Sequence, residues 1–490
     1  MSLSILFSAS EAVPFAKSGG LADVVGSLPR YLRSLGHDVR LVMPRYYRID
    51  KEKYGLRLLP GVLVVPMGIL GDEYCAVYEG VLPDCDVPVY FLEHDGYYGR
   101  DGLYDEANIE FPDNDRRFIF LSKGSLELCK MIGFHPDIIN SNDWHTAAIP
   151  LLLNSIYRND PYVGTAASVL TIHNMQYQGI FPPETIEILG VGWEYFTFLG
   201  IEKDDRVNLL KGGIYNANIL NTVSEGYAAE IGTAEYGWGL ENVLRERSAD
   251  LFGILNGVDY TEWSPETDRH LAANYSAEDM LGKMVCKKEL QRELGLPEDD
   301  TVPLIGVISR MVKQKGIDFL AEALPQLLKL DIQLIMLGEG EPWAHFYFGG
   351  MAAENPTKMR VKVGYDNGLA HRIEAGADFF LMPSAFEPCG LNQMYSMRYG
   401  TLPIVRATGG LDDSVENYNE AEMTGTGFKF RDLTAGAIFD TVGWAVYTWY
   451  NRRAAIEKLR TNAMQMSFTW ESAARKYEHL YMMAISRFQG

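Results

Sequence analysis

Short apolar runs alternate with stretches of helical periodicity along most of the 490-residue chain. In 20–35, the first helical stretch, apolar residues recur every three or four positions and so share one face. Alternating strands and helices predict an α/β fold whose parallel sheets carry helices on both faces. The predicted strands are 5–8, 39–43, 138–141, 169–173 and 219–223 in the first half, and 304–309, 332–337, 379–383 and 402–406 in the second.

Two regions depart from this alternation. Segment 58–94 contains short apolar runs separated by glycine and proline, which predicts antiparallel hairpins inserted in the first domain. The last ~50 residues have a helical pattern throughout. A turn signal at Asn256-Gly257-Val258-Asp259 separates two strand–helix series, so we expect the first domain to cover 1–255.

The net charge of the chain limits the classes of molecule that it is expected to bind. The formal net charge of −21 argues against nucleic acid and against anionic membranes, which are bound by clustered Lys and Arg. It does not exclude an anionic small ligand, which needs only a few local cations, or a neutral polymer such as a glucan.

Cysteine usage indicates a reducing compartment. The five cysteines are scattered without a Cys-x-x-Cys pair, which favours neither a disulfide framework nor a zinc cluster. The apolar run at the N-terminus is too short for a signal peptide, and no run of ~20 apolar residues is long enough for a membrane span. We therefore expect a reducing cytoplasm or a plastid stroma.

A glycine pair stands where the first predicted strand leads into the first predicted helix. Lys17 and Ser18 precede Gly19 and Gly20 there. Paired glycines let backbone amides approach a ligand closely, and a helix N-terminus carries partial positive charge. Phosphate oxygens suit this place, although a tight turn with a solvated lysine is the alternative.

Further polar residues follow predicted strands, and doubly wound sheets bind ligands beyond the carboxyl ends of their strands. Arg310 and Lys315 come after strand 304–309, where two cations would neutralise a diphosphate leaving group unless they are merely solvated. His173 follows another strand, but a lone histidine is often a satisfied core residue. Asp143 beside Trp144 offers hydrogen bonding and apolar ring contact to a sugar.

Several short motifs span nearly the whole chain in a set order. They are Lys-Ser-Gly-Gly-Leu-Ala-Asp-Val at 17–24, Asn-Asp-Trp-His at 142–145, Thr-Ile-His-Asn at 171–174, Ile-Leu-Asn-Gly-Val-Asp at 254–259, Ser309-Arg310 with Gln314-Lys315-Gly316, Glu-Pro-Cys-Gly-Leu at 387–391, and Thr-Gly-Gly-Leu at 408–411. Together they resemble the signatures of the bacterial glycogen synthase and plant starch synthase family, glycosyltransferase family 5.

The resemblance implies the GT-B fold, in which two Rossmann-like, doubly wound domains face each other across a cleft. A nucleotide-sugar-binding domain would cover 256–469, and a final helix at ~470–490 would pack back on the acceptor-side first domain. Binding would close the cleft, with a hinge near 256–259.

The resemblance also implies roles for residues at matching positions. The residues implied in catalysis are Lys17, His173, Arg310, Lys315 and Glu387. Those implied in binding the donor nucleotide or sugar are Gly19, Gly20, Asn174, Asn256, Tyr365, Cys389, Gly390, Leu391, Gly409 and Gly410. Those implied in binding the acceptor or a sugar are Asp23, Tyr104, Asp143 and Trp144. For Cys389 the alternative is a small buried hydrophobe, and for Asp23 it is a favourable charge near a helix N-terminus.

Two Asp-x-Asp triplets match the pattern that holds a divalent metal in another class of glycosyltransferase. Triplet 84–86 lies between two predicted strands among prolines, which favours a hairpin turn. Triplet 113–115 precedes a helical pattern, which favours an N-cap. We expect no metal and no other cofactor. Gly338-Glu339-Gly340 has Trp343 where a nicotinamide-binding motif has its third glycine, so a dehydrogenase is disfavoured.

The activity implied is that of a retaining α-1,4-glucan synthase, which adds glucose from ADP-glucose to the non-reducing end of a glycogen- or starch-type glucan. The departing diphosphate would accept the acceptor proton on the same face, while Arg310 and Lys315 stabilise the developing charge. Two alternatives stay open: a GT-B transferase that uses UDP-glucose, and a catalytically silent glucan-binding or priming protein. The expected partners are ADP-glucose and the glucan, and the expected state is a monomer or weak oligomer.

Overall fold

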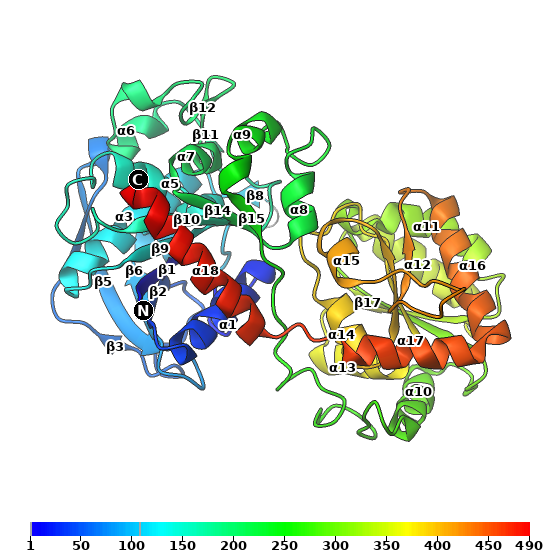
Figure 1. Ribbon diagram of the computed structural model, residues 1–490. Helices are drawn as coiled ribbons and strands as arrows, with labels where there is room; N and C mark the ends of the chain where they lie inside the picture. The colour runs from blue at the N-terminus through cyan, green and yellow to red at the C-terminus, as the bar shows by residue number, and fades with distance from the viewer. Residues whose placement is uncertain (1, 107–108) are drawn as a thin grey trace. The chain divides into compact units, whose positions relative to one another are not determined.

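Residues 2–106 and 109–490, which the computed structural model describes, form two compact units (Figure 1). Unit 1 comprises Met1–Val223, Ala228–Gly257 and Trp470–Gly490. Unit 2 comprises Ser224–Tyr227 and Val258–Thr469. Each unit is built around its own parallel sheet.

The main sheet of unit 1 has parallel strands in the order β15-β14-β10-β9-β1-β2-β6. Their bounds are β1 Ser4–Ser8, β2 Asp38–Pro44, β6 Pro88–Glu93, β9 Ile138–Asn142, β10 Ala167–Ile172, β14 Ile219–Thr222 and β15 Leu251–Gly253. The central β1 sets the register, because its Ile5 lies beside Val39 of β2 and Ile138 of β9. Antiparallel β5 (Asp72–Val81) extends the sheet, and β3 (Arg57–Leu58) and β4 (Leu63–Pro66) pair with it.

The helices of unit 1 pack against this sheet. α1 (Gly20–Ser34) buries the apolar face that its sequence predicts and contacts α18 (Trp470–Gln489), which also contacts β9, β10 and β14. α3 (Asn114–Met131) and α5 (Ala148–Asn154) pack together against other parts of the sheet. The remaining elements are α2 Asp95–Tyr98, α4 Asp143–Thr146, α6 Thr185–Leu189, α7 Leu209–Asn216, α9 Glu241–Glu246, and the short strands β7 Asp105–Glu106, β8 Ile109–Glu110, β11 Ile180–Phe181, β12 Glu202–Lys203 and β13 Arg206–Asn208. α8 (Glu225–Glu230) begins in unit 2 and ends in unit 1.

The sheet of unit 2 is parallel, in the order β18-β17-β16-β19-β20-β21. The strands are β16 Leu304–Ile308, β17 Gln333–Gly338, β18 Met359–Val363, β19 Phe379–Met382, β20 Leu402–Arg406 and β21 Phe428–Phe430. Numbered along the chain, this order is 3-2-1-4-5-6, the order of dinucleotide-binding Rossmann folds. The strands β6-β2-β1-β9-β10-β14 of unit 1 follow the same order.

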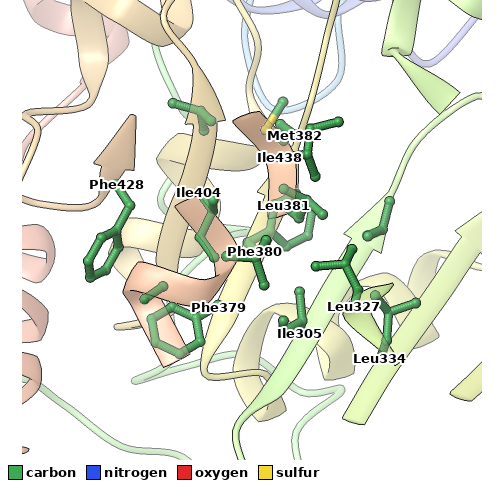
Figure 2. Packing of buried hydrophobic residues seen from close by; sticks show 14 of the residues in the cluster. Ile305, Leu327, Leu334, Phe379, Phe380, Leu381, Met382, Ile404, Phe428 and Ile438 are labelled. Atoms are coloured by element: carbon green, nitrogen blue, oxygen red, sulfur yellow. The ribbon is translucent and has the colours of Figure 1, made fainter. Parts of the chain in front are cut away.

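The core of unit 2 lies between the sheet and its helices (Figure 2). Phe379 and Leu381 of β19 and Ile404 of β20 belong to one buried cluster, to which the helices contribute Leu327 and Ile438. The helices are α10 Leu281–Leu294, α11 Ile317–Leu327, α12 Pro342–Glu354, α13 Asn367–Gly376, α14 Asn392–Arg398, α15 Gly409–Ser414, α16 Ala435–Asn451 and α17 Arg453–Gln465. Strands β16, β17, β19 and β20 are buried along nearly their whole length and are mostly apolar in sequence, which is why they were predictable. Strand β18 is largely unburied, contains two basic residues, and was not predicted.

The structure corrects one part of the predicted topology. β5 and β6 are antiparallel, as predicted for 58–94, but β6 also pairs in parallel with β2 and so belongs to the main sheet. The short strands β15 and β21 were not predicted. Within 2–106 and 109–490, we find no helix with both the length and the apolar character needed to cross a membrane.

Candidate active site

In unit 1 the Lys17 loop lies between the end of β1 and the start of α1. Lys17 Nζ is 2.7 Å from Asp23 Oδ1, one turn into the helix. Gly19 takes the N-cap position in an extended conformation, and Gly20 is the first helical residue. The structure therefore brings Lys17, Gly19, Gly20 and Asp23 together at the N-terminus of α1.

Glu11 underlies this loop. Its Oε1 accepts hydrogen bonds from Ser18 Oγ at 2.7 Å and from the Tyr104 hydroxyl. Its Oε2 accepts from the backbone N–H groups of Ser18 and Gly19, the latter at 3.3 Å. The Tyr104 hydroxyl also lies 2.7 Å from Ser10 Oγ. The predicted acceptor residue Tyr104 is thus connected to the predicted donor loop.

Asp143 and His173 meet where β9 and β10 end. Asp143 Oδ1 accepts from the backbone N–H groups of His173 at 2.6 Å and Asn174 at 3.3 Å. The φ of Asp143 is 52°, in the left-handed region that few residues other than glycine, Asn and Asp adopt. Asn174 Oδ1 in turn accepts from the N–H of Gln176 at 3.0 Å.

Burial changes the protonation of both residues. It raises the pKa of the Asp143 carboxyl to about 7, against the lowering effect of its two backbone donors, and the negative charge of Glu11 adds to the rise. Burial lowers the pKa of His173 to about 3, so its imidazole is neutral at pH 7.

The tautomer of His173 follows from its neighbour Asn142. The Asn142 amide nitrogen donates to the carbonyls of Ser8 at 3.1 Å and Asn140 at 3.3 Å. Its Oδ1 is therefore left to accept from His173 Nε2 at 3.0 Å. The proton then resides on Nε2, and Nδ1 is a hydrogen-bond acceptor.

Two other predicted site residues of unit 1, Trp144 and Asn256, are buried. Trp144 is only 8% exposed, and its ring stacks on His145 while Phe118 contacts it edge-on and Gly179 packs against it. This packing occupies much of the indole surface, so sugar contact by Trp144 stays a prediction. Asn256 is buried near the end of its unit, and its Oδ1 has no hydrogen-bond partner among the residues that the structure describes.

In unit 2 the loops after β16 and β19 lie together, because these strands are neighbours in the sheet. Lys315 Nζ donates to Glu387 Oε2 at 2.5 Å, and Ser384 Oγ donates to the same oxygen at 3.0 Å. The backbone N–H of Ala385 donates to the carbonyl of Gln314 at 2.9 Å. The strand order reverses between β16 and β19, at the point where such sheets bind their ligands.

Arg310 and Tyr365 are exposed at the same edge of this sheet. Arg310 Nη2 lies 3.2 Å from Gln314 Oε1. Tyr365 follows β18, is 82% exposed, and donates from its hydroxyl to Asn367 Oδ1 at 3.0 Å. The geometry thus leaves a cation accessible beyond β16 and an aromatic ring accessible beyond β18, with β17 between these two strands.

The two glycine motifs of unit 2 pack closely on each other. A Cβ on Gly410 would lie 2.1 Å from the Cys389 carbonyl oxygen, and the Gly410 N–H donates to the Glu387 carbonyl at 3.0 Å. Gly390 has a φ of 71°. Gly390 and Leu391 precede α14, and Gly409 begins α15. Cys389 is buried, in accord with the alternative of a small core hydrophobe.

The Asp-x-Asp triplets are engaged in ordinary ion pairs and hydrogen bonds. Asp86 pairs with Arg33 at 2.9 Å, and Asp115 accepts from Thr185 Oγ1 at 3.1 Å. Asp113 takes the N-cap position of α3, as predicted, but its carboxylate accepts from Arg100 at 2.7 Å and makes no capping hydrogen bond. No three His, Cys, Asp or Glu side chains within 2–106 and 109–490 gather as a metal site would require.

Sequence reasoning missed three partners of the predicted residues: Glu11, Asn142 and Ser384. Each follows or ends a buried strand on the carboxyl side, and this position was the available signal. Their hydrogen bonds join segments that are distant in sequence or depend on loop conformation, which periodicity does not reveal.

Known proteins match both units. The family described as Starch synthase catalytic domain matches residues 4–246, and the family described as Glycosyl transferases group 1 matches residues 287–446. The chain is 65% identical over 488 residues to glycogen synthase 1 of Geobacter sulfurreducens, covering 100% of this chain and 97% of that protein.

Two solved structures have folds similar to that of this chain. The catalytic domain of starch synthase IV from Arabidopsis thaliana, bound to ADP and acarbose, has a TM-score of 0.91 at 34% identity and covers 99% of this chain and 100% of its own. Sucrose-phosphate synthase from Thermosynechococcus elongatus, at 16% identity and a TM-score of 0.59 over 98% of each chain, shares the fold. Fold and matches define a glycosyltransferase of the GT-B class. Within that class, the chain belongs to the glycogen synthase and starch synthase family.

Proposed function

We propose that this chain transfers glucose, with retention, from ADP-glucose to the non-reducing end of an α-1,4-glucan. The observation that carries the proposal is the Lys315–Glu387 pair at the switch point of unit 2, with Arg310 exposed beside it. A lysine held at 2.5 Å by a buried carboxylate is positioned before substrate arrives, and preorganised charge is what a diphosphate leaving group needs.

The donor would be bound in unit 2 through its nucleotide and phosphates. Arg310 offers a planar fork and Lys315 a point charge for the diphosphate. The exposed ring of Tyr365 offers a face on which a base can stack. The family relative from Arabidopsis is described as bound to ADP, which supports adenine as the base.

Unit 1 would contribute neutral hydrogen bonds and one cation. With its proton on Nε2, His173 presents Nδ1 as an acceptor for a sugar hydroxyl. Lys17 is half-exposed, and an ammonium there would share the charge of the diphosphate. The diphosphate, stabilised in this way, would accept the proton of the attacking 4-hydroxyl on the face from which it departs.

We also propose that the reaction needs no metal, since Lys17, Arg310 and Lys315 supply the positive charge that a divalent ion provides elsewhere. Glycogen synthase 1 of Geobacter sulfurreducens, which is 65% identical over the whole chain, is a bacterial protein, and this supports a bacterial cytoplasm and glycogen as the product. A monomer or weak oligomer is the proposed state.

The deciding experiment supplies ADP-glucose or UDP-glucose with glycogen, with maltooligosaccharides or without acceptor. Chain extension with a higher kcat/KM for ADP-glucose supports the proposal. An equal or higher kcat/KM for UDP-glucose supports the alternative donor. Glucan binding without transfer from either nucleotide sugar supports the silent alternative.

A further inference from the structure

The buried carboxylate of Glu11 has no role in the mechanism proposed above. This residue follows shortly after β1 and is only 3% exposed. Both carboxylate oxygens accept hydrogen bonds, and all the donors named above come from Ser18, Gly19 and Tyr104. The loop that carries Lys17 is therefore built around this one side chain.

Charge balance explains why the loop takes this shape. A buried carboxylate is costly unless hydrogen bonds satisfy it, and bonds to a charged acceptor are stronger than neutral ones. The nearby cation Lys17 pairs with Asp23, so Glu11 is satisfied by backbone N–H and hydroxyl groups instead. Consecutive N–H groups that converge on one anion form the kind of concavity that elsewhere holds a ligand's phosphate.

This arrangement changes what the loop offers to a substrate. The N–H of Gly19, one of the two glycines that the sequence assigns to phosphate binding, already donates to Glu11, and so does the N–H of Ser18. The Lys17 ammonium is accessible, since the Lys17 side chain is 51% exposed. The internal carboxylate thus takes the place of an external anion.

We propose that Glu11 is a positioning residue for glucosyl transfer, which holds the Ser18–Gly19 backbone so that Lys17 is directed at the donor. This inference rests on the proposed function, and it predicts that Glu11 acts through Lys17. The contact with Tyr104 links the same carboxylate to a predicted acceptor residue, so loop and acceptor side are held by one group.

A double-mutant cycle tests the connection. Glu11→Ala should lower kcat about 10- to 100-fold with little change in KM, because a misplaced loop costs transition-state stabilisation. In a Lys17→Ala background, the same substitution should cost less than about threefold, since the group it positions is gone. Independent, multiplicative losses would overturn the proposal. Glu52→Ala, an exposed glutamate of the same unit, is the matched control.

Glu11→Gln distinguishes positioning from folding or charge. The glutamine Oε1 can accept from the Ser18 and Gly19 amides, while its NH2 group donates to the Ser18 and Tyr104 hydroxyl oxygens, which can also accept. We expect kcat within about threefold of wild type. A Gln variant as impaired as the Ala variant, with both melting at the wild-type temperature, would contradict positioning.

A Ser18→Ala variant and a parallel assay of the wild type distinguish failure of the positioning role from failure to fold and from failure of the proposed function. If Glu11→Ala does not fold, Ser18→Ala removes one donor without touching the backbone amides and should lower kcat by a smaller factor, again only when Lys17 is present. Wild-type enzyme is assayed in parallel. Absence of synthesis by wild type contradicts the proposed function, whereas wild-type synthesis that Glu11→Ala leaves unchanged contradicts the positioning role alone.

Discussion

At the scale of single residues, the loop after β16 carries two exposed cations, Arg310 and Lys313, of which only Arg310 is assigned to the leaving group. Arg310 is exposed and contacts Gln314, while Lys313 is exposed in the short helical turn that follows. If the diphosphate is stabilised by Arg310, its replacement by Ala should lower kcat by about 10² to 10³ without lowering the melting temperature. Lys313→Ala is the control in the same loop and should retain turnover. Near wild-type kcat in Arg310→Ala would contradict the leaving-group assignment.

The raised pKa of the Asp143 carboxyl makes the free energy of unfolding depend on pH. Its folded pKa is raised to about 7, so the folded state holds a proton that the unfolded state releases near its ordinary value. The contribution of Asp143 to the free energy of unfolding therefore falls as pH rises from about 4 to about 7, and is constant above.

Asp143→Asn removes this titration while keeping an oxygen for the His173 N–H, and Asn tolerates a φ of 52°. Relative to wild type, the variant should gain on the order of 2–4 kcal/mol between pH 4 and pH 8, measured by denaturant unfolding. Parallel stability curves for the two proteins would show that Asp143 titrates normally.

The candidate site residues come from motifs in the sequence, whereas the hydrogen-bond partners that hold them do not. Motif matches indicated Lys17, His173, Arg310 and Glu387 because each has a chemical type and a place after a strand. Glu11 was missed because its donors come from the other end of a loop and from Tyr104, 93 positions away. Only the folded chain brings such donors together.

At the scale of elements, Gly316 decides how closely the two loops of unit 2 approach. Its φ is 66°, and a Cβ would lie 1.9 Å from the Pro383 carbonyl oxygen. Gly316→Ala should destabilise the protein by about 2 kcal/mol or more and lower kcat/KM at least tenfold, because the Lys315–Glu387 contact depends on this approach. Thermal unfolding and steady-state kinetics measure the two effects.

Gly349, within α12, is the matched glycine for that experiment. A methyl group added at its Cα would have no atom within 4 Å, and the residue is exposed in a helix interior. Gly349→Ala should leave kcat/KM unchanged and stabilise by up to about 1 kcal/mol. A loss of activity in both variants would mean that kcat/KM is sensitive to glycine replacement in general.

Element prediction succeeded where burial is uniform and failed where strands are short. Most central strands of both sheets are rich in apolar residues, so their existence follows from the local sequence. β15 and β21 have only three residues each, too few for a period to emerge. The parallel pairing of β6 with β2 joins segments separated by a long excursion, and local sequence does not encode it.

At the scale of the whole molecule, the last helix belongs to the first unit. Tyr477 and Tyr481 of α18 are buried, and their hydroxyls bond to Asn221 and Asn140 at 2.8 Å each. A chain that ends at Thr469 should lose the cooperative unfolding transition of unit 1 while unit 2 still melts, because each buried aromatic side chain contributes about 1.5–3 kcal/mol. Calorimetry resolves the two unfolding transitions.

The control for this truncation is a chain that ends at Arg487. It loses only exposed residues and should unfold like wild type.

Metal removal tests the proposed charge balance of the whole enzyme. If Lys17, Arg310 and Lys315 supply the positive charge, glucan synthesis should be unchanged within about twofold after treatment with EDTA. The measurement is the initial rate with and without chelator, followed by addition of Mg²⁺ or Mn²⁺. A rate that disappears with chelator and returns with the ion would refute the metal-free proposal.

Unit 1 is formed from segments that are separated along the chain, so these segments are synthesised at different times. Its first strand leaves the ribosome early, but Trp470–Gly490 is made only after the 258–469 segment. At 5–20 residues per second, the wait lasts about 10 to 50 s. Throughout that time α1 and β10 lack the helix that covers them, so apolar surface is open to chaperones or to other nascent chains. Unit 1 therefore cannot complete its fold until the 258–469 segment of unit 2 has been made.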